Sequence, residues 1–224
     1  MITFLRWWDI LILSLLMFGY PIFLSTSMFF TSQSAQSEIL FTATSNINGL
    51  IMEALQLGLA FLYLLVRKYD FSQWRFKITL KTTIYGILLY LLLSLFMDFV
   101  TIFSYGTEWI FDYTQENNAF LQKFEEFDAT LIIFSLMNGF YEELFFLGIC
   151  LAVQQKYLKY AFLYSLIIRF SFHTYQGFSY ALGISLILGI IYFYFYAKRS
   201  KNLYPYILSH IIADILGLSI IALL

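Results

Sequence analysis

The chain has 224 residues, of which 61% are hydrophobic and 12% are charged, and its formal net charge is −1. An ordinary soluble domain carries about 25% charged residues. The composition therefore excludes a soluble globular protein, and the near-neutral charge argues against nucleic acid as a partner. We predict an all-α, polytopic membrane protein surrounded by lipid.

A transmembrane helix needs about 20 largely apolar residues. Seven stretches approach or exceed this length: 9–30, 48–66, 82–104, 129–153, 161–177, 179–197 and 204–223. They leave no room for a soluble domain. We therefore predict a single membrane domain over residues 1–224, with about seven transmembrane helices.

The basic residues predict the orientation of these helices. Arg169 lies within a predicted span, and the other twelve basic residues lie outside the spans. If Arg6 is cytoplasmic, Lys123 is the only one of these twelve in an outer loop. The other basic residues then all lie inside: Arg67, Lys68, Arg75, Lys77, Lys81, Lys156, Lys159, Lys198, Arg199 and Lys201. The positive-inside rule thus predicts a cytoplasmic N-terminus and an external C-terminus.

The second and third spans each contain one acid, Glu53 and Asp98, about five or six residues from the predicted outer end. We expect both side chains to have structural roles in the outer leaflet, away from the other ionisable groups of the membrane. The loop from Tyr105 to Asp128 carries six acidic residues. It is predicted to be a solvated outer loop or a short amphipathic helix at the membrane surface.

The fourth span contains two adjacent carboxylates, Glu142 and Glu143. An ionised side chain at the centre of a membrane helix costs at least about 2.5 kcal/mol on insertion scales. Acids at this depth are therefore expected to face the protein interior or a water-filled cavity, and to mark a functional site.

The fifth and seventh spans carry possible partners for these acids. Arg169 and His173 lie four residues apart, as do His210 and Asp214, so each pair shares one face of its helix. With a rise of about 1.5 Å per residue and alternating spans, Glu142, His173 and Asp214 lie at similar depths, near the midplane or in the inner half. The sequence therefore predicts that these side chains converge.

This set of residues favours hydrolysis in two ways. A carboxylate beside an imidazole can hold and deprotonate a water molecule. Two imidazoles and a carboxylate can instead bind Zn²⁺ and leave a position open for water. For the second case we predict Glu143, His173 and His210 as the metal ligands; in the first case no cofactor is needed.

Three segments resemble the motifs of the CPBP family of intramembrane proteases, also called the CAAX protease and bacteriocin-processing or Abi family. They are Glu142-Glu143 followed by Gly148, the segment from Arg169 to Gly177 that contains His173, and His210-x-x-x-Asp214, all within 129–223. The resemblance implies that Glu142 activates water with His173 and that Glu143 supports this site. It also implies that His210 and Asp214 bind metal or stabilise the oxyanion.

The first motif of the family usually has an arginine four residues after the second glutamate, and Leu147 occupies that position here. Arg169, one helical turn before His173, is a candidate to supply the missing charge, or it is a separate feature of the second motif. The resemblance implies a peptide or protein substrate in the bacterial plasma membrane. Compact bacterial members of the family are associated with bacteriocin or streptolysin-type peptides, as leader peptidases or self-immunity proteins.

Other functions are compatible with the same residues. A family member that has lost proteolysis could act as a binding protein that gives toxin immunity or regulates a membrane kinase. A proton-coupled transporter also uses intramembrane Glu, His and Asp residues, but the broken helix pairs typical of many transporters are not evident. The polar residues could also be a network that only holds the helices together.

Overall fold

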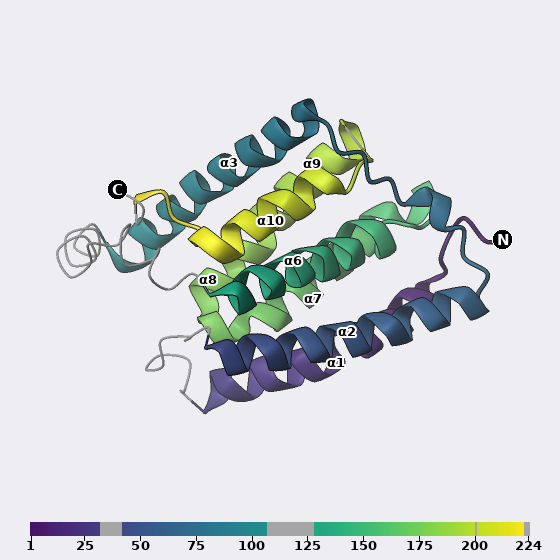
Figure 1. The fold of residues 1–224 in the computed structure, drawn as a ribbon, viewed down its shortest axis with the longest axis horizontal. Coiled ribbons are helices and arrows are strands. Elements are labelled where there is room, and N and C mark those ends of the chain that lie inside the picture. The colour runs from purple at the N-terminus through teal and green to yellow at the C-terminus, as the bar shows by residue number, and fades with distance from the viewer. Residues whose placement is uncertain (32–41, 107–127, 200, 222–224) are drawn as a thin grey trace.

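The computed structural model describes residues 1–31, 42–106, 128–199 and 201–221, and this part of the chain is built from helices (Figure 1). The predicted all-α membrane fold is confirmed. Most of the predicted acidic outer loop, residues 107–127, lies outside the described residues.

Three long helices form the first half of the chain. They are α1 (Trp7–Phe30), α2 (Ala43–Val66) and α3 (Leu80–Tyr105). Polar side chains mark where they begin: the Thr42 hydroxyl accepts a hydrogen bond from the Ser45 amide at 3.2 Å, and the Thr79 hydroxyl accepts one from the Thr82 amide at 3.2 Å. Such caps satisfy amides that have no partner within the helix.

The second half contains shorter helical segments. Helix α6 (Ala129–Glu143) continues into a π-helical segment, Leu144–Ile149, and α7 (Leu158–His173) ends in the 3₁₀ turn Thr174–Gln176. The next span consists of α8 (Phe178–Gly183), the π-helical segment Ile184–Leu188 and α9 (Gly189–Lys198), and α10 (Tyr204–Leu216) is the last helix.

Helices occur at all seven predicted spans, but the last one, predicted over 204–223, ends at Leu216. Five helical segments are long and apolar enough to cross a membrane: Trp7–Phe30, Ala43–Val66, Leu80–Ser104, Ala129–Ile149 and Phe178–Lys198. Helix α7 has 16 residues and α10 has 13. Gly177, which follows the 3₁₀ turn after α7, and Gly217, which follows α10, have φ of +90° and +84°, a conformation that suits glycine. The number of crossings and their orientation remain predictions.

The helices run alternately between two ends of the molecule, with α6 between α10 and α3 on one side and α1 and α2 on the other (Figure 1). One end gathers the N-terminal segment and the short connections between helices. Ile2 pairs with Tyr69, the Leu5 amide donates to the Ala152 carbonyl at 2.7 Å, and Arg75 pairs with Asn202. We call this the basic end, because the predicted cytoplasmic basic residues lie in these segments.

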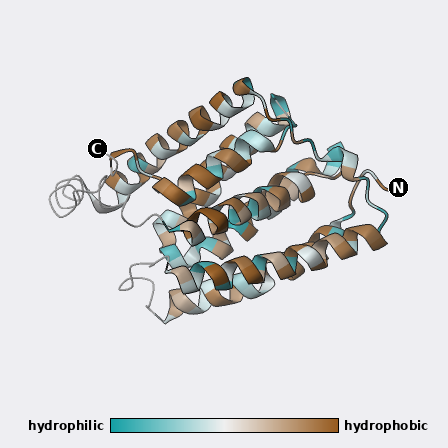
Figure 2. Cartoon of the chain, viewed as in Figure 1, coloured by the Kyte–Doolittle hydropathy of each residue, from teal (hydrophilic) through white to brown (hydrophobic). Residues whose placement is uncertain are grey.

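Hydrophobic residues predominate along the long helices (Figure 2). Large exposed hydrophobic side chains occur along α1, α2 and α3, including Leu15, Phe23, Leu59, Leu62, Leu88 and Leu95. In water such a surface would be unfavourable, but in a bilayer it faces lipid tails of similar polarity. The polar side chains described next are turned inward.

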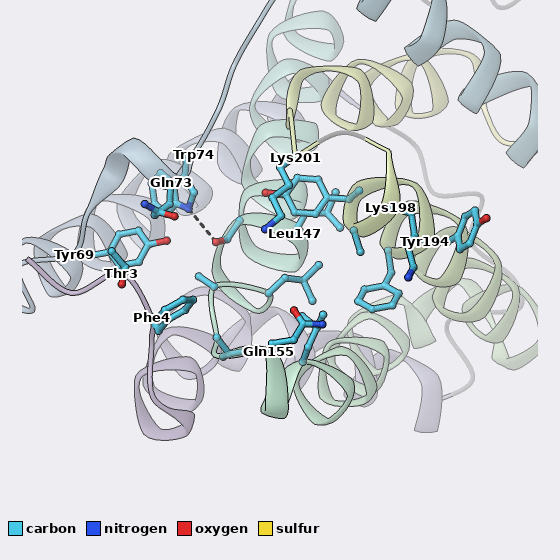
Figure 3. Close-up of a pocket in the computed structure, with 18 residues that line it drawn as sticks. Thr3, Phe4, Tyr69, Gln73, Trp74, Leu147, Gln155, Tyr194, Lys198 and Lys201 are labelled. Atoms are coloured by element: carbon cyan, nitrogen blue, oxygen red, sulfur yellow. Dashed lines mark hydrogen bonds between the residues drawn. The ribbon is translucent and has the colours of Figure 1, made fainter.

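A cavity of about 540 Å³ opens at the basic end, where Tyr69, Trp74, Lys198 and Lys201 contribute to its wall (Figure 3). The Trp74 indole donates a hydrogen bond to the Gly148 carbonyl at 3.0 Å. Carbonyl groups in the last turn of a helical segment have no partner within that segment, and this bond satisfies one of them. The loop that contains Trp74 is thereby attached to the segment that follows the two glutamates.

Candidate active site

Helix α6 places both glutamates in the protein interior, where Glu142 is 1% exposed and Glu143 is fully buried. A close approach of α10 makes this possible. A Cβ atom at Gly139 would lie 2.8 Å from the Ile211 Cγ1 atom, which is closer than ordinary packing allows. The lack of a side chain at Gly139 therefore lets α10 lie against the helix face that carries the acids.

Glu143 is held by two partners from two other helices. The Arg169 Nη2 group of α7 donates to Oε1 at 3.0 Å and to Oε2 at 3.1 Å, and the His210 Nδ1 group of α10 donates to Oε1 at 2.8 Å. A buried carboxylate needs such donors, because transfer of an unpaired charge from water into the interior is strongly unfavourable. Glu143 therefore joins α6, α7 and α10.

Arg169 is 2% exposed, and its guanidinium carbon lies 3.9 Å from the centre of the Phe146 ring. Leu147 is also buried and lines the same small hollow as Arg169. Of the two alternatives for Arg169, the structure agrees with the first: its guanidinium reaches Glu143 from α7, beside the side chain of Leu147.

Glu142 is bound more loosely than its neighbour. Its Oε1 lies 3.7 Å from Nε2 of His210, and its Oε2 lies 3.9 Å from Nε2 of His173 and 3.8 Å from Nη1 of Arg169. These distances are too long for direct hydrogen bonds. They suit groups that act on a water molecule between them.

The surroundings of the two histidines indicate which ring nitrogens carry hydrogen. Nδ1 of His173 donates to the Arg169 carbonyl at 2.7 Å, so in the neutral ring its Nε2 offers a lone pair toward Glu142. Nδ1 of His210 donates to Glu143, and its Nε2 lies 3.5 Å from Oδ1 of Asp214. Asp214 also accepts a hydrogen bond from the Asn138 amide at 2.9 Å.

The structure therefore brings all of the predicted site residues together. Five of them lie in one connected set of contacts, with Arg169 behind Glu143: Glu142, Glu143, His173, His210 and Asp214. Glu142, His173, His210 and Asp214 also line a cavity of about 500 Å³. Aromatic side chains, including Phe172, Tyr175 and Tyr180, form much of the remaining wall.

Glu53 also lines this cavity, so its predicted position away from the other ionisable groups is wrong. Helix α2 packs against α6 and turns Glu53 inward. A signal was present in the sequence, because Asn46, Gly49, Glu53 and Gln56 recur at helical spacing. The structure places Asn46, Glu53 and Gln56 on the buried face of α2.

Asp98 lies elsewhere and holds the end of the chain. Its carboxylate accepts hydrogen bonds from the Ser219 hydroxyl at 2.5 Å and from the amides of Ile220 and Ile221 at 3.1 and 3.4 Å. These bonds join α3 to the segment that follows α10. Asp98 is thus a structural acid, as its sequence position suggested.

The fold and the site define a multi-pass membrane protein with a buried carboxylate and imidazole centre. The family model described as "Rce1-like: Type II CAAX prenyl endopeptidase Rce1-like" matches residues 126–216, which span α6 to α10. Over these residues the chain is similar to CAAX-type intramembrane proteases, and the match supports the resemblance of its three motifs to the CPBP family. No curated protein and no solved structure matches the chain.

Metal dependence is common in this family, and the buried residues fit a divalent ion. Glu142, Glu143 and His210 each offer one ligand atom, and these atoms lie within 4.8 Å of one another. Carboxylate oxygens and imidazole nitrogens are ligands that Zn²⁺ accepts, and Oε2 of Glu142 has no hydrogen-bond partner among the described residues. This group differs from the predicted ligands by containing Glu142 in place of His173.

Proposed function

We propose that the chain is an intramembrane endopeptidase of the CAAX type in which Glu142 is the general base. The observation that carries this proposal is the difference between the two adjacent acids. Glu143 has both oxygens occupied by Arg169 and His210, whereas Glu142 lines the cavity and has no direct hydrogen bond from either histidine. The acid with a free oxygen on the cavity is the one available to water.

The proposed reaction begins with a water molecule between Glu142 and His173. The lone pair on Nε2 of His173 orients one hydrogen of this water, and Glu142 removes the other as the water oxygen attacks the peptide carbonyl carbon. The oxyanion of the tetrahedral intermediate is stabilised by His210, which Asp214 and Glu143 orient. Glu142 then returns its proton to the leaving nitrogen, and the C–N bond breaks.

Glu143 and Arg169 take no proton in this scheme. Their pairing removes one negative charge from beside Glu142 and fixes the position of His210. If Zn²⁺ is resident, Glu142, Glu143 and His210 would hold it, and it would supply Lewis-acid polarisation of the water or the carbonyl. Elemental analysis of the purified protein tests this, and the zinc content of the His210→Ala variant should fall relative to wild type.

We place the enzyme in the bacterial plasma membrane, acting on a membrane-associated peptide during maturation of a bacteriocin or toxin, or during self-immunity. This finer proposal is supported by the resemblance of its three motifs to those of compact bacterial members of the family. The alternative of a binding protein without proteolysis is favoured by Leu147, because the arginine that usually occupies this position in the family motif is missing. The pairing of Arg169 with Glu143 removes that reason, because the charge is supplied from α7.

The test compares cells that express the wild-type protein with cells that express Glu142→Gln at equal membrane levels. Mass spectrometry of membrane peptides should reveal one or more precursors that accumulate uncut only in the variant. Protection of the cells from the corresponding toxin should be lost at the same time. Full protection by Glu142→Gln would contradict the proteolytic mechanism and support a binding protein.

A further inference from the structure

Glu53 differs from the other buried or half-buried acids of the described residues in having neither a hydrogen bond nor an ion pair with an identified partner. Even Glu142, which lacks a direct hydrogen bond to its neighbours, lies within 3.9 Å of His173, His210 and Arg169. Asp9 is paired with Arg67, Asp98 accepts three hydrogen bonds, Glu143 is paired with Arg169, and Asp214 accepts a hydrogen bond from Asn138. Glu53 is 9% exposed, and its Oε2 has no hydrogen-bond partner among the described residues. A buried carboxylate without a donor is unfavourable, so this position requires an explanation.

The cavity that Glu53 lines has an excess of acidic groups. Glu53, Glu142 and Asp214 all contribute to its wall, and no lysine or arginine of the described residues does so. Arg169 lies behind Glu143 and lines a different hollow. A ligand group that enters this cavity therefore meets three carboxylates, and among the described residues Glu53 forms no ion pair.

We propose that Glu53 is a specificity-determining residue that binds a cationic group of the peptide substrate. The group is an amine or guanidinium, from a lysine or arginine side chain or from a free α-amine near the scissile bond. This inference rests on the proposed peptidase function and adds the substrate class. A substrate cation would supply the partner that Glu53 lacks, whereas a carboxylate on the peptide would be repelled by the same three acids.

The aromatic part of the wall favours this class of ligand. Phe134, Phe172, Tyr175 and Tyr180 line the cavity together with Glu53. Aromatic faces attract cations and pack against the aliphatic stem of a lysine or arginine side chain. Glu53 comes from α2, outside the matched residues 126–216, so it is not part of the three motifs.

The test first measures binding without catalysis, which separates this inference from the proposed function. Purified full-length protein in detergent is titrated with pentylamine, a lysine-like cation, and its thermal unfolding is recorded. The neutral analogue pentanol and the anion hexanoate are the matched controls. We expect saturable stabilisation by pentylamine, and affinity at least about tenfold weaker in Glu53→Gln. Asp70→Asn, which removes a half-buried carboxylate that lies beyond the other end of α2 and does not line this cavity, should bind as wild type does.

Equal stabilisation by pentanol and pentylamine in the wild-type protein would overturn the inference, and this comparison needs no variant. Equal pentylamine affinity in wild type and Glu53→Gln would also overturn it. If Glu53→Gln does not fold, Glu53→Asp keeps the charge and should retain the preference for pentylamine over pentanol; loss of this preference would count against the proposal. Leucinamide, which presents an α-amine, distinguishes the two sources: tighter binding of leucinamide assigns the subsite to a peptide N-terminus.

A second measurement uses quenched fluorescent peptides on a lipid anchor, with lysine, norleucine or glutamate at one position beside the scissile bond. Wild type should cleave the lysine peptide with a kcat/KM at least about tenfold above that of the norleucine peptide, and Glu53→Gln should lose this preference. Selective binding of amines without cleavage of any peptide would uphold the cation subsite and contradict the peptidase proposal. Cleavage of the peptides without a preference for lysine would uphold the peptidase proposal and contradict the cation subsite.

Discussion

Arg169 directs its Nη2 group to both carboxylate oxygens of Glu143, at 3.0 and 3.1 Å, across the interface between α7 and α6. The family motif that this segment resembles would supply an arginine at position 147, in the π-helical segment that continues α6. Here the positive charge comes from another helix, one turn before His173. The electrostatic requirement of Glu143 is thus met although the local motif differs.

This pairing predicts the effect of moving the arginine. Arg169→Leu should destabilise the protein by about 3–5 kcal/mol, the range expected when one partner of a buried ion pair is removed. The double variant Leu147→Arg/Arg169→Leu should recover part of that loss, because residues 147 and 169 line the same hollow. Thermal unfolding in detergent measures both effects. A fully stable Arg169→Leu variant would show that the pair is not required.

The assignment of Glu142 as the base predicts loss of activity without loss of fold. Glu142→Gln keeps the size of the side chain but removes its basicity, so peptide cleavage should fall by at least about 10². The unfolding temperature should be unchanged or higher, because a neutral amide is easier to bury than a charge. Near-normal cleavage by this variant would exclude the mechanism, and failure to express would favour a purely structural network.

The position of His173 beside Glu142 predicts that the two act as one unit. His173→Ala alone should be about as inactive as Glu142→Gln alone. The double variant should lose little more, since residues that act on the same water have non-additive effects. Rates of peptide cleavage for the four proteins give the coupling directly. Multiplication of the two single losses in the double variant would mean that the residues act independently.

Asp98 should matter for stability and not for chemistry. In Asp98→Asn, an amide group replaces one of the two oxygens that accept hydrogen bonds from residues 219–221, which should cost about 1–3 kcal/mol. Peptide cleavage should stay within about threefold of wild type, the scale of a small disturbance in the transition-state energy. A loss of activity comparable to that of Glu142→Gln, at normal stability, would place Asp98 in the reaction.

The predicted orientation can be tested by cysteine labelling of intact cells. Ala129→Cys, at the start of α6, should react with a membrane-impermeant maleimide, and Lys201→Cys, at the basic end, should react only after the membrane is opened. The native Cys150 is fully buried and gives little background. The reverse labelling pattern would invert the topology derived from the positive-inside rule.

Local sequence patterns predicted the helices and the convergence of the site residues, because both depend on spacing along the chain. Pairs four residues apart must share a helix face, as His210 and Asp214 do. The position of Glu53 depends instead on how α2 packs against α6, which spacing along α2 alone does not determine. The end of α10 was also misplaced, because the apolar sequence continues past Gly217 although the helix stops at Leu216.

The π-helical segment Leu144–Ile149, which continues α6, is a place where this span can gain or lose a residue. Its wider hydrogen-bonding pattern, with the Cys150 amide bonded to the Phe145 carbonyl at 2.8 Å, accommodates an additional residue per turn. Deleting one residue there would let the turn close as an α-helix and leave both flanks in register. A deletion between Leu131 and Asn138 would instead rotate one flank by about 100° relative to the other. Natural insertions and deletions in this span should therefore be confined to the turn just after Glu143.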